Sequence, residues 1–225
     1  MVRMSNLNLP LIKLLGVTLD SRLNYSSHIS DICKKAGSKV GVLNRLKKLV
    51  PTHALLQLYK AGVLPNLTYC HMVWHFCRAS DTKKLERVKE RALGAVFSNK
   101  TATYEQLLEW AKLTSLENRR LQDILILMYK VKHNLVPKTI IDIFPISNSK
   151  YNSCNKDFSI PRVNTTKYGK HSIRYLGPYL WSKILKRNIN FKSQKTSLKA
   201  FKDAIRGMDI KGLLDGSCNC QVCQS

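Results

Sequence analysis

The segment from Ser27 to Val50 reads SHISDICKKAGSKVGVLNRLKKLV. Its apolar side chains recur at steps of three and four residues, the period at which one face of an α-helix is buried. These side chains are Ile29, Ile32, Cys33, Ala36, Val40, Leu43, Leu46 and Val50. The sequence therefore predicts a helix over Ile29–Leu49. Because the same periodicity recurs further along the chain, it also predicts a mainly α-helical fold.

A short strand or hairpin is predicted before this helix. Leu11–Leu19 mixes β-branched and aliphatic residues around Gly16, a composition that indicates a strand. A second helix is predicted to begin near Thr52. We expect it to bend or break at Pro65, because proline removes a backbone donor from the helix.

Composition and periodicity divide the chain into four predicted regions. They are a strand or hairpin in 1–24, a helical bundle in 25–145, a small basic α+β region in 146–214 and a cysteine-rich tail in 215–225.

Local patterns refine two of these regions. In the bundle, Thr103 and Gln106 have the spacing of a capping box, which predicts the start of a helix. In the third region, Phe158–Val163 and Ser172–Leu176 alternate like the two strands of a hairpin, with a turn at Thr165–Lys170. Two helices are predicted to follow this hairpin.

The net charge of the chain is +24, from 38 Lys and Arg against 14 Asp and Glu. Nucleic acid is the commonest partner of such a surface, because neutralising phosphates releases counterions. An acidic membrane surface is the alternative. No apolar run approaches the roughly 20 residues that a spanning helix needs, and Met1–Ser5 lacks the apolar core of a secretory signal. An intracellular protein of the nucleus or cytoplasm, with reduced thiols, is expected.

Basic side chains gather on the first predicted helix. No Asp or Glu occurs from Ile32 to Ser80. The candidate nucleic-acid-binding side chains here are expected on the polar side of one helix; they are Lys34, Lys35, Lys39, Arg45, Lys47 and Lys48. Unopposed charge on one face repels itself unless an anion covers it, which favours contact with nucleic acid. The alternative is an ordinary solvated face.

A second basic group is predicted in the C-terminal region, where aromatic residues are interleaved with fifteen Lys or Arg and three Asp between Lys150 and Lys211. Such interleaving is typical of proteins that stack the bases of single-stranded nucleic acid. The candidate residues are Lys167, Tyr168, Lys170 and Arg174. For Tyr175, Trp181 and Phe201, the favoured interpretation is instead a small core.

Three cysteines cluster in the tail, at Cys218, Cys220 and Cys223. Zinc prefers four tetrahedral nitrogen or sulfur ligands. A zinc site would therefore need a fourth ligand from His171, Cys154 or another chain, and nothing in the sequence selects one. The alternative is a tail of oxidisable thiols.

No catalytic constellation is present in the sequence. The ten glycines are scattered, and no serine lies in a nucleophile elbow. No two acidic residues are adjacent. Glu86 and Glu90 lie among basic residues such as Lys89 on a helix face, where local ion pairs account for them. His71 and His75 have a metal-compatible spacing but no accompanying glutamate, so we expect them to pack beside a tryptophan.

Five motifs follow one another along the chain. They are Lys13-Leu14-Leu15-Gly16-Val17-Thr18-Leu19-Asp20, the basic helix after Ser27-His28-Ile29, Pro65…Tyr69…Val73-Trp74, Leu85…Val88…Arg91-Ala92, and Ser172…Tyr175-Leu176-Gly177-Pro178…Trp181. Their order resembles the region beyond the catalytic palm in reverse transcriptases of non-LTR (LINE- or jockey-like) retrotransposons. The resemblance extends from about Lys13 to Leu214. One departure is that the family's Trp-Asn-x-Leu-Pro reads Trp181-Ser182-Lys183-Ile184-Leu185 here.

The resemblance implies a role in holding nucleic acid. In the family, the strand at Leu15-Gly16 borders the primer end, and the helices after it form a thumb. The thumb grips the RNA–DNA duplex through its backbone, here through the cations of Ile29–Leu49. The basic C-terminal region would hold RNA or target DNA.

The resemblance also implies what this chain cannot do alone. Polymerisation in the family needs two metal ions, such as magnesium, on paired aspartates, and this sequence has no such pair. The strand that ends at Asp20 follows those aspartates in the family, so Asp20 is expected to be a turn or cap residue. We therefore expect a C-terminal fragment of an RNA-directed DNA polymerase, with the palm and fingers of the parent polyprotein as a partner. The alternatives are a stand-alone RNA- or DNA-binding protein and a helical protein-interaction scaffold.

Overall fold

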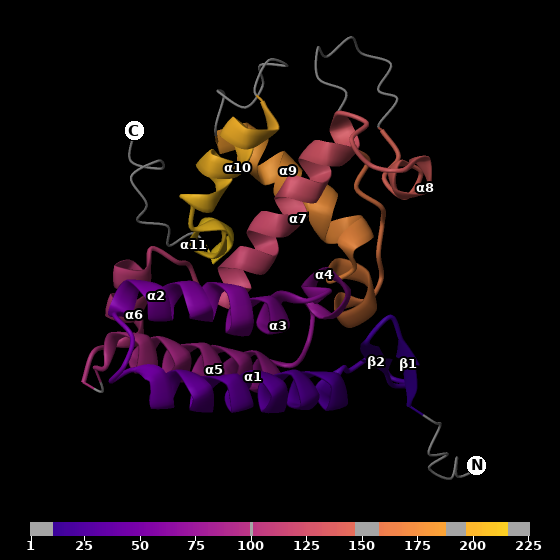
Figure 1. Ribbon diagram of the computed structural model, residues 1–225. Helices are drawn as coiled ribbons and strands as arrows, with labels where there is room; N and C mark the ends of the chain where they lie inside the picture. Colours follow the sequence, from indigo (N-terminus) through magenta and orange to yellow (C-terminus); the bar gives the residue numbers. More distant parts are fainter. Residues whose placement is uncertain (1–10, 100, 147–157, 188–196, 216–225) are drawn as a thin grey trace, which may run out of the picture. The chain divides into compact units, whose positions relative to one another are not determined.

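The computed structural model describes residues 11–99, 101–146, 158–187 and 197–215 (Figure 1). These residues are mainly helical, and a two-stranded antiparallel hairpin precedes the helices. The predicted fold class is confirmed. The chain divides into two compact units, one ending at Leu116 and the other beginning at Glu117.

The first unit begins with a hairpin of β1 (Ile12–Leu14) and β2 (Val17–Leu19), in which Lys13 lies opposite Thr18. The turn residues Leu15-Gly16 have φ angles of 47° and 82°. Positive φ at both positions is the requirement of a two-residue type I′ turn. Glycine adopts this conformation without strain, whereas a leucine side chain rarely does.

The Asp20 carboxylate organises the turn between β2 and the first helix. It accepts hydrogen bonds from the backbone N–H groups of Arg22 and Asn24, both at 2.9 Å, and of Tyr25, at 3.0 Å. The prediction that Asp20 is a turn or cap residue is confirmed. The helix then begins without a side-chain cap, after Tyr25 in the left-handed region.

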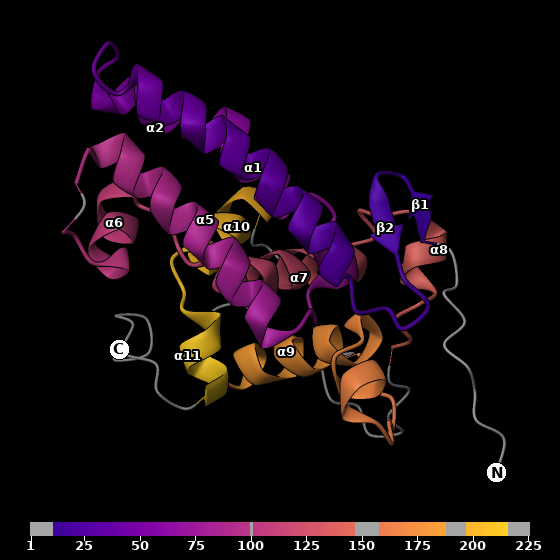
Figure 2. The same ribbon diagram turned by 90° about the horizontal axis from the view of Figure 1, so that it is seen from below.

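Helix α1 (Ser26–Leu46) packs along α5 (Ala79–Phe97), and the two lie side by side in both views (Figures 1 and 2). The predicted apolar face of α1 is buried. Its buried side chains are His28, Ile29, Ile32, Ala36, Val40 and Leu43. A hydrogen bond from Ser26 Oγ to Asp81 Oδ2, 2.6 Å long, joins the beginnings of the two helices.

Four short helices connect α1 and α5: α2 (Thr52–Leu58), the π-helix η1 (Tyr59–Val63), α3 (Leu64–Thr68) and α4 (His71–Trp74). The chain stays helical through Pro65, because the π-turn places this proline at the start of α3. A missing N–H is tolerated there. The predicted break lies instead at Tyr69, which is extended, and Cys70, which is left-handed.

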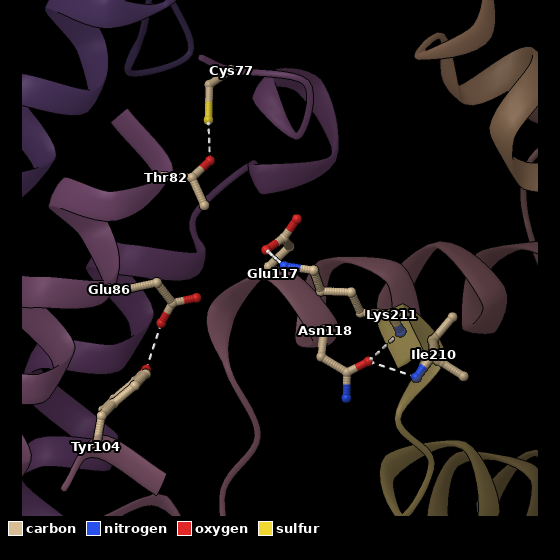
Figure 3. A network of polar contacts seen from close by, with 8 residues as sticks. All are labelled: Cys77, Thr82, Glu86, Tyr104, Glu117, Asn118, Ile210 and Lys211. Carbon is tan, nitrogen blue, oxygen red and sulfur yellow. Dashed lines mark hydrogen bonds and ion pairs between the residues drawn. The ribbon is translucent and has the colours of Figure 1, made fainter. Parts of the chain in front are cut away.

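Helix α6 (Tyr104–Ala111) begins with the predicted capping box. Thr103 accepts a hydrogen bond from the Gln106 backbone, and the Gln106 side chain accepts one from the Thr103 N–H at 3.0 Å. The Tyr104 hydroxyl donates to Glu86 on α5 (Figure 3). Burial and the neighbouring Glu86 carboxylate raise the pKa of Tyr104, so the hydroxyl remains a donor.

The second unit contains five helices and one π-helix among its described residues. They are α7 (Leu116–Lys132), α8 (Lys138–Ile141), η2 (Thr166–Lys170), α9 (Ile173–Arg187), α10 (Leu198–Arg206) and α11 (Ile210–Asp215). Aromatic rings fill its core: Phe158 packs on Trp181, and Trp181 on Phe201, with ring centroids 5.9 and 6.0 Å apart. Phe201 also stacks on Tyr129 at 4.4 Å.

The predicted strands at Phe158–Val163 and Ser172–Leu176 are wrong. In the described part of this region, strand pairing is limited to one bridge between Ile146 and Phe158. The second predicted strand falls in α9, where it is followed by buried residues at helical spacing, Leu180, Trp181 and Ile184. Five alternating residues are too few to outweigh a helical period that continues for two further turns.

Gly177 allows α9 to approach α7 closely. A Cβ atom at this position would lie 2.6 Å from Met128 Sδ and 3.5 Å from the Phe144 ring. The side of α9 that carries Gly177 therefore faces the core, and residues half a turn away lie on the opposite side.

The buried amide of Asn118 fixes the approach of α11 to α7. Its Oδ1 accepts from the N–H groups of Ile210 at 2.8 Å and Lys211 at 3.3 Å (Figure 3). Its Nδ2 donates to the Met208 carbonyl at 3.0 Å. An exposed ion pair between Lys211 and Glu117, 2.7 Å long, lies beside it.

Candidate nucleic-acid interface

Three of the predicted cations form an exposed row on α1. Lys34, Lys35 and Arg45 are all exposed. At about 100° of helix rotation per residue, Lys34 and Arg45 lie about 20° apart on the side away from the buried face, whereas Lys35 lies at the edge of that side, next to buried His28. The row runs about 16 Å along the helix from Lys34 to Arg45, at 1.5 Å per residue.

Lys39 differs from these three, because its ammonium group already has a partner. It donates a hydrogen bond to the Gly62 carbonyl oxygen in η1 at 2.9 Å. The Asn66 side chain donates to the same oxygen. Lys39 therefore joins α1 to the π-helix, and its position borders the buried face of α1.

The last two predicted cations lie beyond the end of the helix. Helix α1 ends at Leu46, so Lys47 occupies its C-cap position and Lys48 the turn that follows. Lys47 is half-buried and Lys48 is exposed. The prediction that all six cations share the polar side of one helix is wrong for these two residues.

The exposed row has no carboxylate partners. Among the described residues, none of Lys34, Lys35, Arg45 and Lys48 forms an ion pair; in this unit, Lys84 pairs with Asp81 at 2.9 Å. The one acidic residue of α1, Asp31, is exposed. Asp31 lies about one turn before Lys34 and Lys35 but forms no ion pair with either, so the row keeps a net positive charge.

Two glycines lie between the ends of the row. A Cβ atom at Gly37 or Gly41 would meet no atom within 4 Å. Glycine inside a helix costs about 0.5–1 kcal/mol relative to alanine, and packing inside this unit does not require it at either position. No side chain projects from α1 at these two positions between Lys34 and Arg45, so another molecule can approach the helix backbone there.

A small polar pocket of about 120 Å³ lies where α1 meets the hairpin and α3. Its lining includes the side chains of Lys13, Lys35 and His28. His28 Nδ1 accepts from the Thr18 N–H at 3.3 Å. Burial lowers the pKa of His28; Lys35 lowers it further, and Asp31 opposes both. The imidazole is thus held in its neutral form.

In the second unit, the predicted residues lie in η2 and at the start of α9. Tyr168, Lys170 and Arg174 are exposed, and the side chain of Lys167 lies outside the described residues. Trp181 and Phe201 belong to the core, as predicted. Tyr175 does not.

Tyr175 lies on the outer side of α9, in a row that the sequence prediction missed. Its ring stacks on that of Tyr179 with centroids 5.8 Å apart and planes 15° apart. Lys183 Nζ lies 5.6 Å from the Tyr179 ring centroid. The four-residue spacing of these three residues is visible in the sequence, but it identifies a helix face only once the segment is known to be helical.

No metal site is identified in the described part of the chain. It contains no group of three or more His, Cys, Asp or Glu placed to hold a metal ion. The predicted zinc ligands Cys218, Cys220 and Cys223 lie outside the described residues. His71 packs edge-on against Trp74, with ring centroids 6.5 Å apart, and His75 Nδ1 is hydrogen-bonded to the Met72 carbonyl.

No described helix combines the length and apolar character needed to cross a bilayer. In the comparisons with known proteins, no family model, no curated protein and no solved structure matches this chain.

Proposed function

We propose that this chain binds nucleic-acid duplexes through their phosphate backbone, as the thumb and following region of a non-LTR retrotransposon reverse transcriptase would. It would do so without polymerase chemistry of its own. The observation that carries the proposal is the row of Lys34, Lys35 and Arg45, exposed and without carboxylate partners on a helix that the rest of the unit holds in place.

A duplex offers more than enough phosphates for each cation of this row. Double-stranded DNA carries about one phosphate charge per 1.7 Å of its axis. A duplex lying along the roughly 16 Å from Lys34 to Arg45 would therefore present about ten phosphate charges. Lysine and arginine side chains are long enough to reach phosphates on either side of the helix, and such contacts carry no sequence information.

The two glycines support the same interpretation. Gly37 and Gly41 weaken an exposed helix, and their Cβ positions are open. A sugar–phosphate backbone that approaches α1 closely would benefit from the missing side chains. A partner held only at the tips of the lysines would gain nothing from them.

The hairpin supports a protein partner in addition. All three residues of β1 are exposed, and the turn residue Leu15 is 82% exposed although it adopts a conformation unfavourable for leucine. The other strand, β2, is held against α1 through Val17 and the hydrogen bond from Thr18 to His28, so the exposed apolar residues of β1 and the turn are the part left for a partner. We propose that this apolar edge packs against the palm and fingers of the parent polyprotein. The sequence has no adjacent acidic residues that could hold the two metal ions of polymerisation.

Equilibrium binding tests the proposal. The purified chain would be titrated with RNA–DNA duplexes of equal length and unrelated sequence, and primer extension on an RNA template would be measured with the same preparation. The expected results are similar affinities for all the sequences and no extension. Selectivity for one sequence, or no duplex binding at low salt, would contradict the proposed backbone contact.

A further inference from the structure

The outer side of α9 carries two tyrosines that the core does not use. The inner side is buried through Gly177, Leu180 and Ile184. Tyr175 and Tyr179 are one helical turn apart on the other side, and both are partly exposed. Aromatic rings on the solvent side of a helix are available to stack against another molecule.

The geometry of the two rings suits a flat ligand. Their planes differ by 15°, so the pair presents nearly parallel faces in place of the edge-to-face packing found between Phe158 and Trp181, whose planes differ by 80°. Among the described residues, neither tyrosine hydroxyl has a hydrogen-bond partner. The pair thus offers ring faces together with polar edges.

The segment that carries the pair has positive charges only. From Phe158 to Lys202 the sequence has eleven Lys or Arg and no Asp or Glu. Lys183 extends over the Tyr179 ring, and the neighbouring Lys170 and Arg174 are exposed. A ligand of this surface must therefore combine planar groups with negative charge.

We infer that Tyr175, Tyr179 and Lys183 form a stacking site for the bases of single-stranded nucleic acid. Bases in a duplex are stacked on one another, whereas those of a single strand are available to aromatic side chains. Lys183, Lys170 and Arg174 would hold the phosphates on either side of the stacked base. This inference rests on the proposed nucleic-acid binding, but it concerns the other unit and the bases in place of the backbone.

The test compares ordinary and abasic single strands. A fluorescent 12-nucleotide oligonucleotide and an abasic strand of the same length carry the same phosphates, and only the first has bases to stack. The wild-type chain should bind the ordinary strand roughly 5- to 150-fold more tightly, the range expected for one stacked base. The Tyr175→Leu and Tyr179→Leu variants should lose that difference, because leucine keeps the helix but removes the ring.

Two controls separate stacking from other effects. Tyr179→Phe keeps the ring and should keep the preference for the ordinary strand. A blunt RNA–DNA duplex should bind wild type and the leucine variants equally, and circular dichroism should show that these variants are folded.

Equal wild-type affinities for the ordinary and abasic strands would overturn the inference. So would a preference for the ordinary strand that survives both leucine substitutions. Failure of the proposed function has a different signature: the chain would not bind duplex, while its preference for the ordinary strand would remain sensitive to Tyr175→Leu.

Discussion

The Lys39 ammonium donates a hydrogen bond to the Gly62 carbonyl at 2.9 Å, so one lysine of α1 stabilises the fold while its neighbours face solvent. This difference predicts two separable effects. Lys39→Ala should lower the free energy of unfolding by about 0.5–1.5 kcal/mol, the usual worth of one hydrogen bond, and change duplex affinity little. Lys34→Ala should weaken duplex binding and change the free energy of unfolding little. Urea unfolding and duplex titration of both variants check this, and two indistinguishable variants would contradict it.

Replacing the glycines of α1 by alanine should stabilise the fold and weaken duplex binding. Gly37→Ala and Gly41→Ala should each raise the free energy of unfolding by about 0.5–1 kcal/mol, because alanine favours the helix and its Cβ meets nothing. The same substitutions should weaken duplex binding, because the methyl groups occupy the surface that the backbone approaches. Stabilised variants with undiminished affinity would show that the duplex does not approach α1 at these glycines.

Asp81 should make the first unit sensitive to acid. Burial raises the pKa of this carboxyl, but the hydrogen bonds from Ser26 and Lys84 and the nearby positive charges outweigh burial, so the pKa lies below its ordinary value of 3.8. The ionised Asp81 carboxylate therefore stabilises the folded state above about pH 4, and this stabilisation is lost as the pH falls through the folded-state pKa. Asp81→Asn should be less stable at pH 7, with a shallower loss of stability in acid.

Thermal unfolding between pH 7 and pH 2.5 measures this difference. Asp31→Asn, which changes an exposed acid on α1, is the matched control and should follow the wild-type curve. A steep acid transition that persists in Asp81→Asn would assign it to other groups.

The contact between Gly177 and Met128 should limit what α9 tolerates. In Gly177→Ala the new Cβ would lie 2.6 Å from Met128 Sδ, and overpacking of this kind typically costs about 1–3 kcal/mol. Because Sδ and Cγ of Met128 make the contact and valine lacks the sulfur, the double variant Gly177→Ala/Met128→Val should recover part of the loss. Chemical denaturation gives both values, and additive destabilisation in the double variant would show that this contact is not the cause.

Periodicity and local capping predicted the first unit well. The buried face of α1 and the box at Thr103 and Gln106 depend on residues three or four apart, which the sequence contains directly. The features that the sequence did not predict depend on partners far away in the chain. Lys89 has the spacing of a surface residue, yet it is buried and donates to the Thr114 carbonyl. Lys39 likewise becomes a structural residue only because the π-turn presents the Gly62 carbonyl.

The second unit was harder to predict from sequence. Ser172–Leu176 alternates like a strand over a few residues, and only the packing of Gly177 on Met128 fixes which side of the segment is inside. The outer position of Tyr175 follows from that packing. Aromatic residues in a basic segment indicate either a core or a binding surface, and composition alone does not separate the two.

The salt dependence of duplex affinity shows whether the cations of α1 contact phosphates. Each phosphate contact contributes roughly 0.9 to the slope of log affinity against log salt concentration. The variant Lys34→Ala/Lys35→Ala/Arg45→Ala should therefore have a slope shallower than wild type by about 2 to 3, while Lys39→Ala should retain the wild-type slope. Equal slopes for wild type and the triple variant would contradict phosphate contact by α1.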